Sequence, residues 1–173
     1  MKAHHLMFAR YNQWANARVY EAAAALDDAD YRADRGAFFK SLHGTLNHLL
    51  VADRIWMRRF TGTGETVDRL DAILFETLAA LTAARQAEDE RIIDWIAGLD
   101  EMAFTSKFRY RAVSVPREYE QELAPALAHF FNHQTHHRGH AHAILTGLCG
   151  RAPELDLLFF QRDAGIGGTR RLG

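Results

Sequence analysis

Apolar positions recur every three or four residues along most of the chain, which is the spacing of one face of a helix. Four long segments show this pattern, and they predict helices at residues 4–26, 38–60 and 77–98 and a last long helix that contains residues 128–145 and has Pro125 in its first turn. In the second segment the steps alternate between four and three residues, as in a seam between packed helices. That seam consists of Leu42, Leu46, Leu49, Asp53, Trp56 and Phe60. The pattern predicts an all-α chain whose last long segment is the final helix of a bundle.

The shorter segments show other patterns. Residues 104–119 alternate apolar and polar side chains and contain Val, Phe and Tyr, which predicts a short β-hairpin before the last long helix. Residues 27–37 are polar and predict a loop, whereas the apolar side chains of residues 156–161 predict a short element that needs cover. Because residues 166–173 are rich in glycine, we expect a flexible tail there and a single domain over residues 1–165.

Three charged residues fall on or near the apolar seams. Arg85 and Asp89 are four positions apart and can pair on one helix. Arg85 and Asp89 have two interpretations. They belong either to a solvent-exposed face, where the apolar stripe turns away around the helix, or to a buried polar network with Asp53 that orients a histidine ligand. For Asp53 itself, the two interpretations are an acceptor for the N–H of a ligand and a buried ion pair with an arginine such as Arg85.

The bulk composition narrows the function classes. The chain has 173 residues, 48% hydrophobic and 25% charged, which is ordinary for a globular domain. A formal net charge of −1 argues against nucleic acid as a partner. The single cysteine, Cys149, excludes an internal disulfide. Because no apolar run reaches a membrane-spanning length and no secretory segment is recognised, we expect no membrane partner and a cytoplasmic location.

Histidines are concentrated in the last predicted long helix, where residues 128–145 hold six of the ten. At about 100° per residue, His133 and His137 share the core-facing stripe. Imidazoles four positions apart on one face point at a common spot, and a buried imidazole is costly unless its nitrogens are bonded. A divalent cation would bond both rings; the alternative is two core histidines bonded to protein acceptors. The others are His129, His136 and His140 on the flank of the stripe, and His142 near the opposite side.

A third ligand must come from another part of the chain, and His48 is the candidate. It lies at the edge of the seam in the second predicted helix. His43 lies about 140° around that helix from His48, so we expect it to face solvent. His4 and His5 precede the core pattern of the first helix, and we expect them to be frayed.

Four sequence motifs follow one another in the order in which a known family carries them. They read YNQWAN, LHGTLNHLLVADRIW, RQAEDERI and HFFNHQTHHRGHAHAIL, within residues 5–162. The chain resembles the DinB family of DinB/YfiT-like proteins. The resemblance implies an up-down-down-up four-helix bundle, a homodimer, and a divalent metal held by three histidines, which correspond here to His48, His133 and His137. At His140 many members carry Gln, which leaves open a swapped or expanded ligand set.

A cation held by three neutral imidazoles keeps an open coordination position, as in catalytic sites. It would lower the pKa of a coordinated water towards ~7 and would deprotonate a thiol. All-nitrogen ligation suits Zn, Ni, Fe or Mn. His136 and His140 flank the ligands, either as proton shuttles or as surface histidines of the helix edge.

We therefore expect a metal-dependent enzyme that acts on a small-molecule substrate. The resemblance favours thiol-dependent S-transfer with a low-molecular-weight thiol, and a metal-dependent hydrolase is the alternative. A second alternative is a non-catalytic, metal-binding stress-response bundle. The enzyme requires a cavity that opens onto the metal, whereas the non-catalytic bundle would have no cavity and a shell closed by His140.

Overall fold

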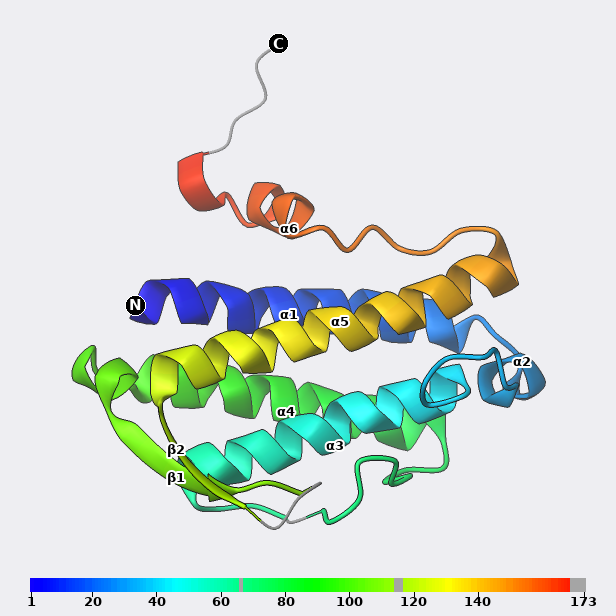
Figure 1. The fold of residues 1–173 in the computed structure, drawn as a ribbon. Coiled ribbons are helices and arrows are strands. Elements are labelled where there is room, and N and C mark those ends of the chain that lie inside the picture. The colour runs from blue at the N-terminus through cyan, green and yellow to red at the C-terminus, as the bar shows by residue number, and fades with distance from the viewer. Residues whose placement is uncertain (66, 114–116, 169–173) are drawn as a thin grey trace.

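The computed structural model of the protein describes residues 1–65, 67–113 and 117–168 (Figure 1). Four long helices dominate the fold, and a two-stranded hairpin and shorter helices connect or cover them. In chain order the elements are α1 (Lys2–Ala24), α2 (Asp28–Arg32), α3 (Leu42–Thr61), α4 (Leu78–Gly98), the 3-10 helix η1 (Met102–Thr105), β1 (Lys107–Arg111), β2 (Glu118–Glu122), α5 (Leu123–Cys149), α6 (Leu157–Asp163) and the 3-10 helix η2 (Ile166–Gly168).

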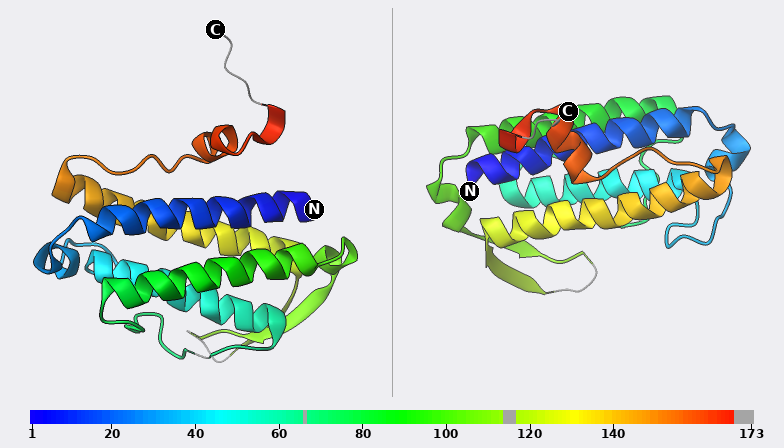
Figure 2. Two further views of the ribbon diagram at one scale, coloured as in Figure 1. Left: turned by 180° about the vertical axis from the view of Figure 1, so that it is seen from behind. Right: turned by 90° about the horizontal axis from the view of Figure 1, so that it is seen from above.

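The four long helices lie side by side as a bundle (Figures 1 and 2). Helix α1 packs against α4 and α5, and α3 packs against the same two helices from the other side. Their apolar faces form the core, in which side chains such as Leu46, Leu127 and Phe130 are almost fully buried. In the described part of the chain, no helix is long and apolar enough to cross a membrane.

The predicted long helices are present, but two of their starting points were wrong. Helix α3 begins at Leu42, four residues later than predicted, because Ser41 caps it and its Oγ accepts the N–H of Gly44 at 3.0 Å. Lys40, with a φ of 65°, has a left-handed backbone that a helix cannot continue through. Helix α5 begins at Leu123, slightly before the predicted start, and it has Pro125 in its first turn as expected.

The polar stretch 27–37, predicted as a loop, contains the short helix α2. Its N-terminus is capped by Asp27, whose carboxylate accepts the N–H of Asp30 at 2.7 Å. Arg32 and Asp28, four residues apart, pair at 2.9 Å on its surface. Both features can be read from the sequence as a helix start and an i,i+4 pair, but the lack of an apolar stripe hid them.

The hairpin predicted before the last long helix is confirmed. Strands β1 and β2 are antiparallel, with a register that runs from Lys107 opposite Glu122 to Arg111 opposite Glu118. The tip of the hairpin lies outside the described residues. Helix α6 covers one side of α1, where Phe160 is buried. In the predicted flexible tail, residues 166–168 form η2, and the remaining residues lie outside those described.

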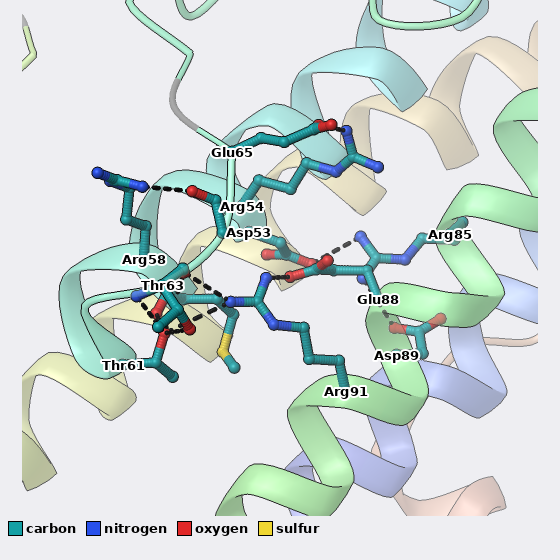
Figure 3. A network of polar contacts seen from close by, with 12 residues as sticks. Asp53, Arg54, Arg58, Thr61, Thr63, Glu65, Arg85, Glu88, Asp89 and Arg91 are labelled. Carbon is teal, nitrogen blue, oxygen red and sulfur yellow. Dashed lines mark hydrogen bonds and ion pairs between the residues drawn. The ribbon is translucent and has the colours of Figure 1, made fainter.

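A buried network of charged and polar side chains crosses the bundle (Figure 3). Arg85 pairs with Asp53 at 2.6 Å and with Asp89 at 3.1 Å, and all three side chains are at most 3% exposed. Asn16 of α1 donates to Asp89 at 3.0 Å. The expected Arg85–Asp89 pair is therefore confirmed, and the interpretation of these residues as a solvated face was wrong.

The ion pairs keep the Arg85 guanidinium charged inside the core. Burial alone would lower the pKa of Arg85, but the carboxylates of Asp89 and Asp53 outweigh it and raise that pKa. Two residues of α5 extend the network, since Gln134 donates to Asp53 and Arg138 donates to Asn12. The network thus ties together all four long helices.

Candidate metal centre

The three histidines predicted as metal ligands lie together between α3 and α5. His48 projects from α3, and His133 and His137 project from α5. One nitrogen of each ring lies within 4.8 Å of one nitrogen of each of the others. The ring centroids are 4.4 Å apart for His48–His137 and His133–His137, and 5.2 Å apart for His48–His133. This spacing can hold one cation between the three rings.

The orientation of His48 is set by the chain that follows α3. Its Nδ1 lies 2.7 Å from the carbonyl oxygen of Leu70. Because a carbonyl can only accept, Nδ1 carries the proton and Nε2 presents a lone pair. On its other side the ring stacks on Phe39, with centroids 3.7 Å apart and planes 16° apart. His48 is therefore held in the tautomer that a metal ligand requires.

Two of the ring nitrogens at this site have no protein partner. Within the described part of the chain, His48 Nε2 and His137 Nδ1 are buried and make no hydrogen bond. Buried polar atoms are nearly always satisfied in native proteins, so such atoms call for a missing partner. If the three histidines were ordinary core residues, His133 and His137 would bond to protein acceptors. No such bond involves either ring among the described residues. The donor set therefore fits a divalent cation.

Segment 67–77, between α3 and α4, returns along α3 and completes this site. Asn47 of α3 holds it: the side-chain oxygen accepts the backbone N–H groups of Leu74 at 2.8 Å and Phe75 at 3.1 Å. This contact brings the carbonyl of Leu70 onto His48. Periodicity along the helices carries no information about this segment, so Leu70 was not predicted as part of the site. Phe39 was not predicted either, because residues 38–41 were assigned to the second helix, which begins only at Leu42.

Burial keeps the three imidazoles neutral, which is the form that binds metals. It lowers the pKa of His48. It also lowers the pKa of His133 to about 4 and that of His137 to about 3, and in both cases neighbouring histidines lower it further. Little competition from protons is therefore expected in the folded protein near neutral pH.

The same shifts predict that the metal-free protein loses stability as the pH falls from about 7 to 4. An unfolded histidine titrates near 6.5, whereas the folded pKa of His133 is about 4 and that of His137 about 3. Well above pH 6.5 these imidazoles are neutral in both the folded and the unfolded chain. Between the two pKa values the unfolded chain binds more protons, so each such histidine destabilises the fold by up to about 1.4 kcal/mol per pH unit.

Urea unfolding of EDTA-treated protein at several pH values measures this dependence. The comparison is a His133→Gln/His137→Gln variant, which lacks these two titrating side chains and keeps the rest of the chain. Its stability should fall less steeply below pH 6.5 than that of the unchanged protein. Parallel curves for the two proteins would show that these histidines are not buried in neutral form.

His136 and His140 form a second, more exposed grouping with His137. One ring nitrogen of each residue lies within 4.8 Å of the others; His136 is exposed and His140 is half-buried. The ring centroid of His140 is 5.2 Å from that of His137, and its Nδ1 is buried without a partner among the described residues. His140 therefore adjoins the triad through His137 and keeps the expanded ligand set open. His142 belongs to neither grouping.

The interpretation of Asp53 as the acceptor for a ligand N–H is wrong. The carboxylate pairs with Arg85 at 2.6 Å and accepts from Gln134, whereas the acceptor for His48 is the Leu70 carbonyl. The alternative, a buried ion pair, is the arrangement in the structure. Both interpretations require a buried Asp, and the helical pattern alone cannot separate them.

Two other histidines are buried where we expected exposure. His43 is 6% exposed, and its Nε2 donates to the carbonyl of Phe75 at 3.0 Å. The expected solvent face of α3 is thus covered by segment 67–77. His5 was expected to be frayed, but α1 begins at Lys2 and the His5 ring stacks on Phe104 with centroids 5.0 Å apart.

A cavity of about 280 Å³ shares His133 with the triad. It lies between α3, α5 and the hairpin, and its walls combine aromatic, aliphatic and basic side chains. The lining residues are Ala52, Ile55, Trp56, Arg59, Leu70, Tyr110, Ala112, Val113, Tyr119, His129 and His133. His129, expected on the flank of the stripe, contacts Trp56 with ring centroids 5.2 Å apart and planes tilted by 57°. A small molecule in this cavity would lie beside a candidate ligand of the metal.

Comparison with known proteins agrees with the order of motifs along the chain. The sequence profile of the DinB family matches residues 1–170. A curated relative, Protein DinB of Bacillus subtilis (strain 168), is 27% identical over 145 residues, which are 78% of this chain and 80% of that protein. The match extends over the helices that carry the three histidines, as well as the hairpin and α6. The chain therefore belongs to the DinB family.

Proposed function

We propose that His48, His133 and His137 hold one divalent cation, and that the protein is an enzyme acting on a small molecule in the neighbouring cavity. The observation that carries the proposal is a cluster of three imidazoles, of which two have a buried nitrogen with no partner among the described residues and one, His133, also lines a cavity. An enzyme needs such a cavity for its substrate, whereas a metal that only joins two helices needs none. Zn, Ni, Fe and Mn all suit the donor set.

The reaction that we favour is thiol-dependent S-transfer, in keeping with the thiol-using members that the family resemblance implies. A bound divalent cation would supply Lewis acidity and lower the pKa of a thiol beside it. The electron pair on the sulfur of a low-molecular-weight thiol would form a bond to an electrophilic carbon. The leaving group would depart with its own electron pair, and the thiol proton would pass to solvent. A hydrolase with water in place of the thiol is the alternative chemistry.

The chain's own residues supply the positioning that this reaction needs. The Leu70 carbonyl fixes the tautomer of His48, and Phe39 covers the face of that ring and so limits access of water. His133 lies where the cavity meets the triad. We include in this proposal the up-down-down-up helix order, a homodimer and a cytoplasmic location, as expected from the resemblance and the composition.

A non-catalytic metal-binding bundle is the second candidate. It is favoured by one observation, the partnerless Nδ1 of His140 beside His137. If His140 completed a four-histidine shell, no position would remain for a substrate. Replacement of His140 by Gln separates the two candidates by the affinity for the metal, which should stay unchanged if the centre has three ligands and fall if His140 is a fourth ligand.

Elemental analysis of protein purified without a metal-affinity column tests the proposal first. We expect one divalent cation per chain. A screen of small thiols with an aromatic electrophile such as 1-chloro-2,4-dinitrobenzene then tests the reaction, which should depend on the metal and cease after chelation. If the protein holds one metal per chain but shows no thiol-dependent turnover, S-transfer is rejected and the hydrolase and the non-catalytic bundle are the remaining candidates. If the protein holds no metal, the whole proposal is overturned.

A further inference from the structure

Arg59 lies in the wall of the cavity without an acidic partner. It projects from α3, is half-buried, and lines the same space as His133. Among the described residues it forms no ion pair, and its single hydrogen bond runs from Nη2 to the carbonyl of Arg111 at 3.2 Å. Two other arginines of the bundle have acidic partners, since Arg54 pairs with Glu65 at 2.6 Å and Arg85 with Asp53.

Two aromatic rings hold the guanidinium of Arg59 in place. Its central carbon lies 4.5 Å from the ring centroid of Trp56 and 4.8 Å from that of Tyr110. Contacts of this kind stabilise a cation and restrict its motion without using its N–H donors. Arginine carries five donors in a planar fork, and the one bond to Arg111 leaves the others available. The side chain is therefore held in place for an acceptor that the described residues do not supply.

The rest of the wall favours an anion as well. The lining includes His129 and His133 and contains no Asp or Glu among the described residues. His129 and Arg59 both contact the Trp56 ring and both line the cavity. A half-buried cation in such surroundings attracts an anionic ligand more strongly than it would in open solvent.

We propose that Arg59 is an anion subsite of this cavity, and that the small molecule bound there carries a carboxylate which the guanidinium receives. The planar fork of Arg matches a carboxylate in a two-bond geometry, and the aliphatic side chains of the wall, such as Ile55 and Ala52, suit the carbon skeleton of the ligand. The reacting group of the ligand then lies towards His133. This inference rests on the proposed function for the thiol and the metal, but carboxylate binding at Arg59 needs neither.

The first test compares two thiols of one length, 3-mercaptopropionate and 3-mercapto-1-propanol, on cobalt-loaded protein. The sulfur-to-cobalt charge-transfer absorption reports the Kd of each. We expect the carboxylate to bind about tenfold more tightly, as for one charge-assisted contact. Arg59→Gln should bring the ratio of the two Kd values close to one. Arg58→Gln should keep it, because Arg58 is exposed on the same helix and donates to the carbonyl of Gly64, away from the cavity.

The second test uses metal-free protein, with benzoate and benzyl alcohol as probes and the NMR signal of the Trp56 indole N–H as the readout. Benzoate should shift this signal in the unchanged protein and in Arg58→Gln, and not in Arg59→Gln. If no thiol binds cobalt but the benzoate-induced shift still requires Arg59, the S-transfer proposal fails and the carboxylate subsite stands. If the carboxylate preference is absent, or is unchanged in Arg59→Gln, the subsite is wrong.

Discussion

His133→Ala is expected to lower the affinity for a divalent cation by more than about a hundredfold, which exceeds the usual loss for a residue that only orients a ligand. The variant removes one of the three imidazoles, so only two ligands remain to hold the cation. His137→Ala and His48→Ala should act in the same way. Titration with zinc against a chelating dye measures the change, and circular dichroism confirms that each variant is folded.

His142→Ala is the matched control, because it lies on the same helix and belongs to neither histidine grouping. Its metal content should equal that of the unchanged protein. His140→Gln should also leave the zinc affinity unchanged if the centre has three ligands, whereas the loss of a fourth ligand would lower it. One tightly bound metal in both His133→Ala and His137→Ala would refute the assignment of the site to these residues.

Arg85→Met is expected to lower the free energy of unfolding by about 3–5 kcal/mol, because it leaves buried carboxylates without their cation. Arg85 is 2% exposed and holds Asp53 at 2.6 Å and Asp89 at 3.1 Å (Figure 3). Burial raises the pKa of Asp89, and without Arg85 both acids would be driven towards the protonated form. Urea unfolding at pH 7 on metal-free protein measures the loss.

The control for this prediction is a variant that removes an arginine from an arginine–aspartate pair on the surface. Arg69 contacts Asp71 at 2.9 Å with both side chains mostly exposed, so Arg69→Met should change stability far less than Arg85→Met does. Adding Asp53→Asn and Asp89→Asn to Arg85→Met should recover part of the loss, since it removes the uncompensated charges. Equal effects of Arg85→Met and Arg69→Met would show that the network is not buried in solution.

The buried network also bears on the metal centre, through the position of α5. Gln134 and Arg138 each follow a metal-ligand candidate by one residue, and both are fully or almost fully buried. Gln134 contacts Asp53 and the carbonyl of Leu49, and Arg138 contacts Asn12 and Asn16. These contacts fix the rotation of α5 and thereby turn His133 and His137 towards α3. Asp53 thus affects the site through the helix and not through a bond to a ligand.

The sequence predicted the parts of the site that depend on position within a helix. His133 and His137 are four residues apart on one face, so helical geometry alone places their rings together. His48 could be chosen because few other histidines lie near an apolar seam. The match between these three positions and the family resemblance made the choice firmer than either observation alone.

The parts that could not be predicted depend on how loops return to the helices. The Leu70 carbonyl, the Phe39 ring and the burial of His43 all follow from segments between helices, which have no periodic signal. The sequence likewise gives no sign that Arg59 lacks a partner, because pairing depends on which side chains the fold brings near it. Asp53 was recognised as unusual, but only the position of Arg85 in three dimensions decided its role.

The most direct test of the three-histidine centre is anomalous diffraction at the zinc absorption edge from crystals grown with zinc. The expected result is one strong peak between α3 and α5, about 2.0–2.1 Å from one nitrogen each of His48, His133 and His137. A peak on His136 and His140 that leaves His48 uncoordinated would contradict this assignment. So would a site between the three rings that stays free of metal at saturating zinc.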